Sequence, residues 1–109
     1  MPTKFTENVI NIISNIPEGK VLTYGTIAAL AGSPRGARQV TRILHSSSKK
    51  HNLPWHRVIN SKGKISLRFP AAYHEQKVLL ESEGIVFSKD DRIDLKKYLW
   101  SIRSILELK

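Results

Sequence analysis

Hydrophobic side chains recur every three or four positions near the start of the chain, at Phe5, Val9, Ile12, Ile13 and Ile16. This spacing predicts an amphipathic helix over residues 3–16. The turn-forming segment Pro17-Glu18-Gly19 is expected to end it. Thr23 is a suitable N-cap for a second helix over residues 24–30.

A third helix is expected directly after Gly32, with Ser33 as its N-cap and Pro34 at its first position. The run Ser46-Ser47-Ser48 is expected to end it. Two short helices joined by a turn that contains glycine are typical of a helix-turn-helix, here over residues 23–48.

The second half of the chain mixes short extended and helical patterns. A strand over 64–66 follows a predicted turn at Ser61-Lys62-Gly63. A helix over 71–83 is expected to turn Tyr73, Val78, Leu79 and Leu80 inward. Residues 85–87 favour β structure, and a last helix is predicted over 95–109. The pattern indicates one mostly helical α+β domain over residues 1–109.

The composition agrees with one globular domain. Of 109 residues, 40% are hydrophobic and 25% are charged, which excludes wholesale disorder and leaves room for one core. No apolar run approaches the roughly 20 residues of a membrane-spanning helix. The first seven residues have no hydrophobic signal core, so secretion is not expected. The absence of cysteine excludes disulfides and thiol nucleophiles. The four histidines lack metal-site spacing, so we expect neither a metal nor another cofactor.

Basic charge is concentrated in one long segment. The formal net charge is +9, and no acidic residue occurs between Glu18 and Glu75. That segment contains ten basic residues: Lys20, Arg35, Arg38, Arg42, Lys49, Lys50, Arg57, Lys62, Lys64 and Arg68. Such a distribution favours binding to the phosphates of a nucleic acid. The alternatives are a solvated basic face, or one that contacts an anionic membrane or an acidic protein.

The segment Pro54-Trp55-His56-Arg57-Val58-Ile59 resembles the Pro-Cys-His-Arg-Val active-site motif of the O6-alkylguanine-DNA alkyltransferases, with tryptophan in the cysteine position. Residues 19–25, 37–40 and 79–85 resemble three further segments of that family, in the same order and spacing. The tryptophan points to the alkyltransferase-like proteins, a cysteine-lacking branch that binds alkylated DNA without repairing it.

The resemblance implies a helix-turn-helix or winged-helix-like DNA-binding fold with a pocket for the damaged base, formed by Trp55, Tyr24, Val58 and Arg68. Trp55 would pack against an extruded guanine, and Tyr24 would help to rotate the nucleotide out. The carbonyl of Val58 would accept a hydrogen bond from the guanine amino group, and Arg68 would lie over the base. From the residues alone, Trp55 and Tyr24 are also compatible with core packing, and Arg68 with a phosphate contact.

The resemblance also implies DNA-binding residues on the third helix: Arg35, Gly36, Ala37, Arg38, Gln39 and Arg42. Arg38 would enter the base stack in place of the extruded nucleotide, although a phosphate contact is the simpler reading. The small residues Gly36 and Ala37 would let this helix approach the minor groove. His56, Arg57 and Glu83 correspond to the network that activates the enzymes' cysteine. Without a thiolate they are expected to be structural partners.

The resemblance, together with the missing cysteine, implies a non-enzymatic sensor that binds O6-alkylguanine in double-stranded DNA and flags it for nucleotide excision repair. We expect it to act as a monomer. It would work at the nucleoid of a bacterium or in the nucleus of a eukaryote, away from membranes. Two alternatives are a transcription regulator that reads undamaged DNA and an enzyme of other chemistry that uses His56 and Glu83.

Overall fold

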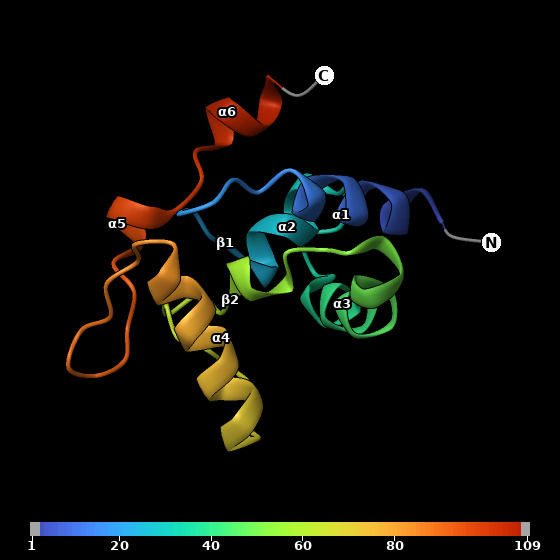
Figure 1. Cartoon of the computed structure of the whole chain (residues 1–109). Coiled ribbons are helices and arrows are strands. Elements are labelled where there is room, and N and C mark those ends of the chain that lie inside the picture. Colours follow the sequence, from blue (N-terminus) through green and yellow to red (C-terminus); the bar gives the residue numbers. More distant parts are fainter. Residues whose placement is uncertain (1–2, 108–109) are drawn as a thin grey trace.

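The structure is a computed structural model that describes residues 3–107 (Figure 1). Its elements, in chain order, are α1 (Lys4–Ser14), β1 (Leu22–Thr23), α2 (Tyr24–Leu30), α3 (Ala37–His51), the 3-10 helix η1 (Trp55–Arg57), β2 (Val58–Ile59), α4 (Pro70–Ser82), α5 (Leu95–Tyr98) and α6 (Ile102–Leu106). The predicted fold class, mostly helical with little β structure, is confirmed.

The helices α1 and α2 form close to where the sequence predicts them. Thr23 caps α2, because its side-chain oxygen accepts a hydrogen bond of 3.1 Å from the backbone N–H of Thr26. Gly32 follows α2 with a φ of 108°, a left-handed conformation that favours glycine.

The start of α3 differs from the prediction. Ser33 and Pro34 do not begin the helix; they form a turn in which the N–H of Gly36 donates to the carbonyl oxygen of Ser33 over 2.8 Å. Proline suits the second position of such a turn as well as it suits the first position of a helix, so its fixed φ could not decide between them. The helix begins at Ala37, with Gly36 as N-cap.

The predicted end of α3 at residues 46–48 is also wrong, because the helix continues to His51. The hydroxyl of Ser48 donates to the carbonyl oxygen of Leu44 one turn earlier, which lets a serine fit inside the helix. Asn52 ends the helix in a left-handed conformation with φ 50°. Basic side chains in the last turn interact favourably with the helix dipole: Lys49, Lys50 and His51.

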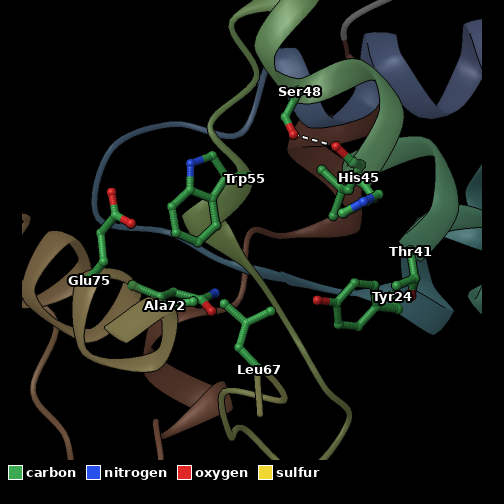
Figure 2. A pocket seen from close by; sticks show the side chains of 10 residues that line it. Tyr24, Thr41, His45, Ser48, Trp55, Leu67, Ala72 and Glu75 are labelled. Carbon is green, nitrogen blue, oxygen red and sulfur yellow. Dashed lines mark hydrogen bonds between the residues drawn. The ribbon is translucent and has the colours of Figure 1, made fainter. Parts of the chain in front are cut away.

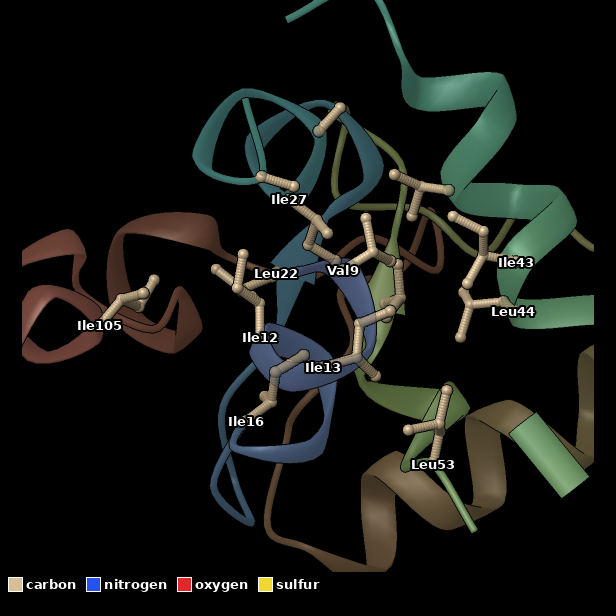
Figure 3. Close-up of a cluster of buried hydrophobic side chains, with 14 of the residues drawn as sticks. Val9, Ile12, Ile13, Ile16, Leu22, Ile27, Ile43, Leu44, Leu53 and Ile105 are labelled. Carbon is tan, nitrogen blue, oxygen red and sulfur yellow. The ribbon is translucent and has the colours of Figure 1, made fainter. Parts of the chain in front are cut away.

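A two-stranded parallel sheet lies between two groups of buried side chains. Leu22 of β1 pairs with Val58 of β2, and Thr23 pairs with Ile59. Successive side chains of a strand point to opposite faces. Leu22 and Val58 therefore join the larger core with α1–α3, part of which is shown in Figure 3. Ile59 belongs to the smaller core with Val21, Leu80, Ile85, Ile93 and Tyr98.

The buried face of α4 is only partly the predicted one, since Leu80 is buried as expected. We expected an inward stripe of Tyr73, Val78, Leu79 and Leu80. The buried residues are Gln76 and Leu80, and Val78 is 46% exposed. A hydrophobicity pattern cannot reveal that an amide is buried, since burial of Gln76 depends on hydrogen bonds to a distant segment.

The predicted strand over 64–66 is reduced to one antiparallel bridge between Lys64 and Arg92. Gly63 before it has a φ of 78°, and a Cβ at that position would lie 2.5 Å from the carbonyl oxygen of Ile93. This turn therefore needs glycine for its conformation and for the close approach of residues 92–93.

The predicted helix over 95–109 is divided into α5 and α6, and residues 108 and 109 lie outside the described part. Between the two helices, the backbone N–H of Trp100 donates to the carbonyl oxygen of Val21 over 2.9 Å. This long-range pairing replaces helical hydrogen bonds, and Ser101 then caps α6. No helix within the described residues is long and apolar enough to cross a membrane.

Candidate functional site

A cavity of about 330 Å³ lies where α2, α3, η1 and α4 meet (Figure 2). Its lining side chains come from five segments: Tyr24, Thr41, Leu44, His45, Ser48, Trp55, Leu67, Ala72, Glu75 and Gln76. The indole of Trp55 lies on one side of this space, while Tyr24 and Thr41 approach from the other (Figure 2). The volume is within the range of small-molecule pockets.

Sequence reasoning found Trp55 and Tyr24 in this cavity but missed the contributions of α3 and α4. The α3 residues that line it follow the spacing of one helix face: Thr41, Leu44, His45 and Ser48. Ala72, Glu75 and Gln76 have the same spacing on α4. The helical spacing was visible in the sequence, but the side of each helix that faces the cavity was not.

Trp55 begins η1 and is half-buried, so that it packs on the larger core and also lines the cavity. Its ring lies edge-on to that of His56, with centroids 6.1 Å apart and planes at 83°. The tight turn is closed by the Arg57 N–H, which donates to the carbonyl oxygen of Pro54 over 3.0 Å. The indole is therefore held by both its packing and its backbone.

His56, Arg57 and Glu83 form one hydrogen-bonded network, as the sequence comparison implied. Glu83 Oε2 lies 2.6 Å from His56 Nε2 and 2.7 Å from an Arg57 guanidinium nitrogen. Burial raises the pKa of Glu83, but hydrogen bonds from Arg57, the Gly19 N–H and His56 outweigh burial and lower that pKa to about 2. The carboxylate is therefore ionised at neutral pH, and its hydrogen bonds fix the turn behind Trp55.

Gln76 of α4 also holds this turn. Its side-chain Nε2 donates to the carbonyl oxygens of His56 and Val58, each over 3.0 Å. Val58 itself is 1% exposed and does not line the cavity. Its carbonyl, predicted from the resemblance to receive a guanine amino group, already accepts a hydrogen bond from Gln76.

Arg68, predicted as a pocket residue, is exposed and lies outside the cavity lining. Its neighbour Leu67 lines the cavity, and Phe69 on the other side is 77% exposed. The segment that carries Arg68 therefore borders the cavity, and the Arg68 side chain forms no ion pair within residues 3–107. A role for Arg68 over a bound base stays a prediction.

The basic residues of α3 lie beside the cavity. Arg38, Arg42 and His45 are exposed and follow one another at the spacing of one helix face. Thr41, His45 and Ser48 form the adjacent, cavity-lining face, so His45 belongs to both. Of the ten basic residues in the acid-free segment, only Arg57 forms an ion pair within residues 3–107.

Residues 4–85 match the family described as the DNA-binding domain of 6-O-methylguanine DNA methyltransferase. The chain belongs to this family. The DNA base-flipping protein of Escherichia coli (strain K12) is 46% identical over 97 residues, which cover 89% of this chain and 74% of that protein. Alkyltransferase-like protein 1 of Schizosaccharomyces pombe is 39% identical over 102 residues, covering 89% of this chain and 94% of that protein.

The fold is similar to that of a solved structure of S. pombe Atl1. The crystal structure of S. pombe Atl1 in complex with damaged DNA containing O6-carboxymethylguanine matches with a TM-score of 0.78 and 38% sequence identity. The match covers 93% of this chain and 99% of that chain. The resemblance to alkyltransferase-like proteins, drawn from four sequence segments, is confirmed.

Within this methyltransferase-family domain, Gly36 has an internal reason to be small. Gly36 is buried, and a Cβ there would lie 2.9 Å from Cζ of Phe5 and 3.1 Å from the carbonyl oxygen of Ser33. This close packing favours glycine at position 36 independently of any contact with DNA. In contrast, Arg35 and Gln39 are exposed, and Ala37 is half-buried.

The site offers few groups for other chemistry. Among residues 3–107, no three histidine, aspartate or glutamate side chains gather closely enough to hold a metal ion. The ionisable groups of the cavity lining are Tyr24, His45 and Glu75. His56 and Glu83, the pair of the alternative enzyme reading, are bonded to each other and lie outside that lining.

Proposed function

We propose that this protein binds duplex DNA containing O6-alkylguanine, receives the modified nucleotide in the cavity beside Trp55, and leaves the alkyl group in place. The observation that carries the proposal is that Trp55 lines a cavity of suitable size next to the exposed basic face of α3. The names of the relatives support it, since one is a DNA base-flipping protein and another has been solved with damaged DNA.

The pocket residues explain binding without transfer. Alkyl transfer needs a strong nucleophile such as a thiolate, and this chain has no cysteine. An indole is an N–H donor with an apolar ring, so Trp55 would stack on the base and pack against its alkyl group. Aromatic stacking of this kind contributes roughly 0.5–1.5 kcal/mol beyond burial, which offsets part of the few kcal/mol of unstacking.

Arg38 and the other free basic residues of α3 would bind the duplex. Phosphate contacts fix the position of a protein on DNA without reading the sequence, which suits a protein that searches for damage. A planar guanidinium could also fill the gap that an extruded nucleotide leaves. A protein that does not remove the alkyl group must pass the lesion on, and we propose nucleotide excision repair proteins as its recipients and a monomer as the active form.

The test compares binding to duplexes that differ only by O6-methylguanine or guanine at one position, followed by mass spectrometry after long incubation. We expect tighter binding to the modified duplex, an unchanged protein mass and an intact lesion. Trp55→Leu should reduce this preference while its melting temperature is monitored separately. Equal affinity for the two duplexes, or a protein mass increased by one alkyl group, would contradict the proposal. Faster incision of the lesion by purified excision-repair proteins when this protein is added would support the hand-over.

A further inference from the structure

Two basic side chains are held directly opposite each other outside α3. Lys64 and Arg92 form an isolated antiparallel bridge, and residues directly opposite in such a bridge point to the same face. Arg92 is exposed and Lys64 is half-buried. Neither forms an ion pair within residues 3–107, although Asp90 and Asp94 flank Arg92 in the sequence. Like charges opposite each other are destabilising, so the pair works against the stability of the fold.

The carboxylate that lies near this pair is bound by other residues. Asp91 lies 2.8 Å from Nζ of Lys77 and accepts a hydrogen bond of 2.9 Å from the Tyr73 hydroxyl, both on α4. These two hydrogen bonds are the main causes that lower the pKa of Asp91, and the charge of Lys64 contributes least. Asp91 therefore neutralises Lys77, which leaves the charges of Lys64 and Arg92 in excess.

The backbone holds both cations in place. Oδ1 of Asn60 accepts a hydrogen bond of 3.0 Å from the backbone N–H of Lys64. Arg92 is tied to the same turn by the residue that follows it, because the N–H of Ile93 donates to the carbonyl oxygen of Gly63 over 2.8 Å. The two basic side chains therefore start from fixed positions, and little backbone ordering is needed when they bind an anion.

The pair lies a short length of chain from the cavity of Figure 2. Leu67 lines that cavity, and the three residues from Lys64 to Leu67 span at most about 11 Å. The loop of residues 86–93, which contains Arg92, lies on the opposite side of α4 from α3 (Figure 1). The cavity therefore has basic residues on two sides, those of α3 on one and the Lys64–Arg92 pair on the other.

We propose that Lys64 and Arg92 bind backbone phosphates of the duplex that flanks the nucleotide in the cavity, about three base pairs away in one direction. The proposal rests on the proposed function, because it requires a duplex bound over the cavity. A reach of about 11 Å equals roughly three steps of the duplex, whose rise is about 3.4 Å per base pair. An acidic protein would satisfy the same charges, but the short distance to the cavity places a bound duplex within reach.

A phosphate beside the pair reverses the sign of its contribution. In the free protein the two cations repel each other, whereas a bound phosphate attracts both. The pair should therefore lower the stability of the free protein and raise its affinity for DNA. Replacing both residues with neutral ones should have the opposite effect on each property, which a purely structural role of the pair would not produce.

The main variant combines Lys64→Gln with Arg92→Gln. Each lost phosphate contact should reduce the slope of log affinity against log salt by about 0.9, so the slope should fall by about two. Between about 50 and 200 mM salt, the wild type should then lose about tenfold more affinity than the variant. The ratio of affinities for O6-methylguanine and guanine duplexes should not change, and the melting temperature should stay the same or rise.

Lys96→Gln with Arg103→Gln is the matched control. It removes one lysine and one arginine, both exposed, from α5 and α6. Its salt slope should stay near the wild-type value. An unchanged slope in the Lys64 and Arg92 variant, or an equal reduction in both double variants, would overturn the proposal, because the second result would show that only the net charge matters.

A comparison of duplex lengths tests the position of the contact. One O6-methylguanine duplex extends about ten base pairs on both sides of the lesion, and two others keep only about two base pairs on the 5′ or the 3′ side, too few to reach the pair. The affinity lost in the Lys64 and Arg92 variant should disappear on one of the shortened duplexes and persist on the other. An equal loss on all three would contradict a contact with the flank.

The same titrations separate the two proposals. If the wild type binds O6-methylguanine and guanine duplexes equally, the proposed function fails. If the wild type prefers the modified duplex but the Lys64 and Arg92 variant binds every duplex as the wild type does, only the role of this pair fails.

Discussion

The guanidinium of Arg57 binds the carboxylate of Glu83 through three N–H···O contacts of 2.7, 3.0 and 3.1 Å. This pair joins η1 to the C-terminal end of α4. A further guanidinium N–H donates to the carbonyl oxygen of Ile16 over 2.8 Å, and the Gly19 N–H donates to Glu83 over 2.9 Å. The turn behind Trp55 is therefore connected both to α4 and to the segment that follows α1.

Glu83→Gln should destabilise the protein. The substitution keeps the shape of the side chain but leaves Arg57, whose side chain is only 17% exposed, without a counter-charge. Loss of one partner from such a pair should lower the free energy of unfolding by about 2–3 kcal/mol. Urea unfolding measures this change. Glu81→Gln on the same helix is the control, and a similar small effect of both variants would show that the network contributes little.

Acid should weaken the fold through the same carboxylate. The folded state holds the Glu83 pKa at about 2, below its ordinary value of 4.5, so the unfolded chain binds a proton at higher pH than the folded chain. The contribution is complete above pH 4.5 and is lost as the pH falls towards 2. The stability difference between wild type and Glu83→Gln should therefore shrink over that interval. Urea unfolding at a series of pH values measures it, and a constant difference would contradict this assignment.

Arg38→Ala should reduce the preference for damaged DNA more than it reduces general binding. Arg38 lies on the exposed face of α3 beside the cavity, and the other free basic residues still contact phosphates. Arg35→Ala is the matched control, since Arg35 is exposed in the turn before α3. Titrations of both variants with O6-methylguanine and guanine duplexes measure the ratio. If both variants lose affinity equally for both duplexes, Arg38 is a phosphate contact only.

Arg68→Ala distinguishes a contact with the base from a contact with phosphate. A cation–π contact over an extruded base contributes on the order of 1 kcal/mol, so its loss should weaken binding of the modified duplex about fivefold and spare plain DNA. Arg68→Lys should be intermediate, because an ammonium keeps the charge but not the planar group. Salt-dependent titrations decide the question. A salt slope reduced by about one unit with an unchanged affinity ratio would identify a phosphate contact.

The sequence alone determined the features that depend on neighbouring residues. The helical spacing near the start of the chain and the cap at Thr23 predicted α1 and α2 closely, because both are local. The absence of cysteine excluded a thiol nucleophile. The motif around Trp55 led to the family and to the network of His56, Arg57 and Glu83, since residue identities and their order are read directly.

Only the tertiary structure decided the features that depend on distant partners. The hydrogen bonds between the backbones of Trp100 and Val21 divide the predicted C-terminal helix. Gln76 on α4 can be buried because its amide donates to the carbonyl oxygens of His56 and Val58. The cavity is formed by helix faces from different parts of the chain. Sequence reasoning therefore placed Arg68 in the pocket, although it lies outside the lining, and did not find Gln76, which belongs to it. Hydrogen bonds between distant segments leave no periodic trace in a sequence, and they fix which polar atoms face a ligand.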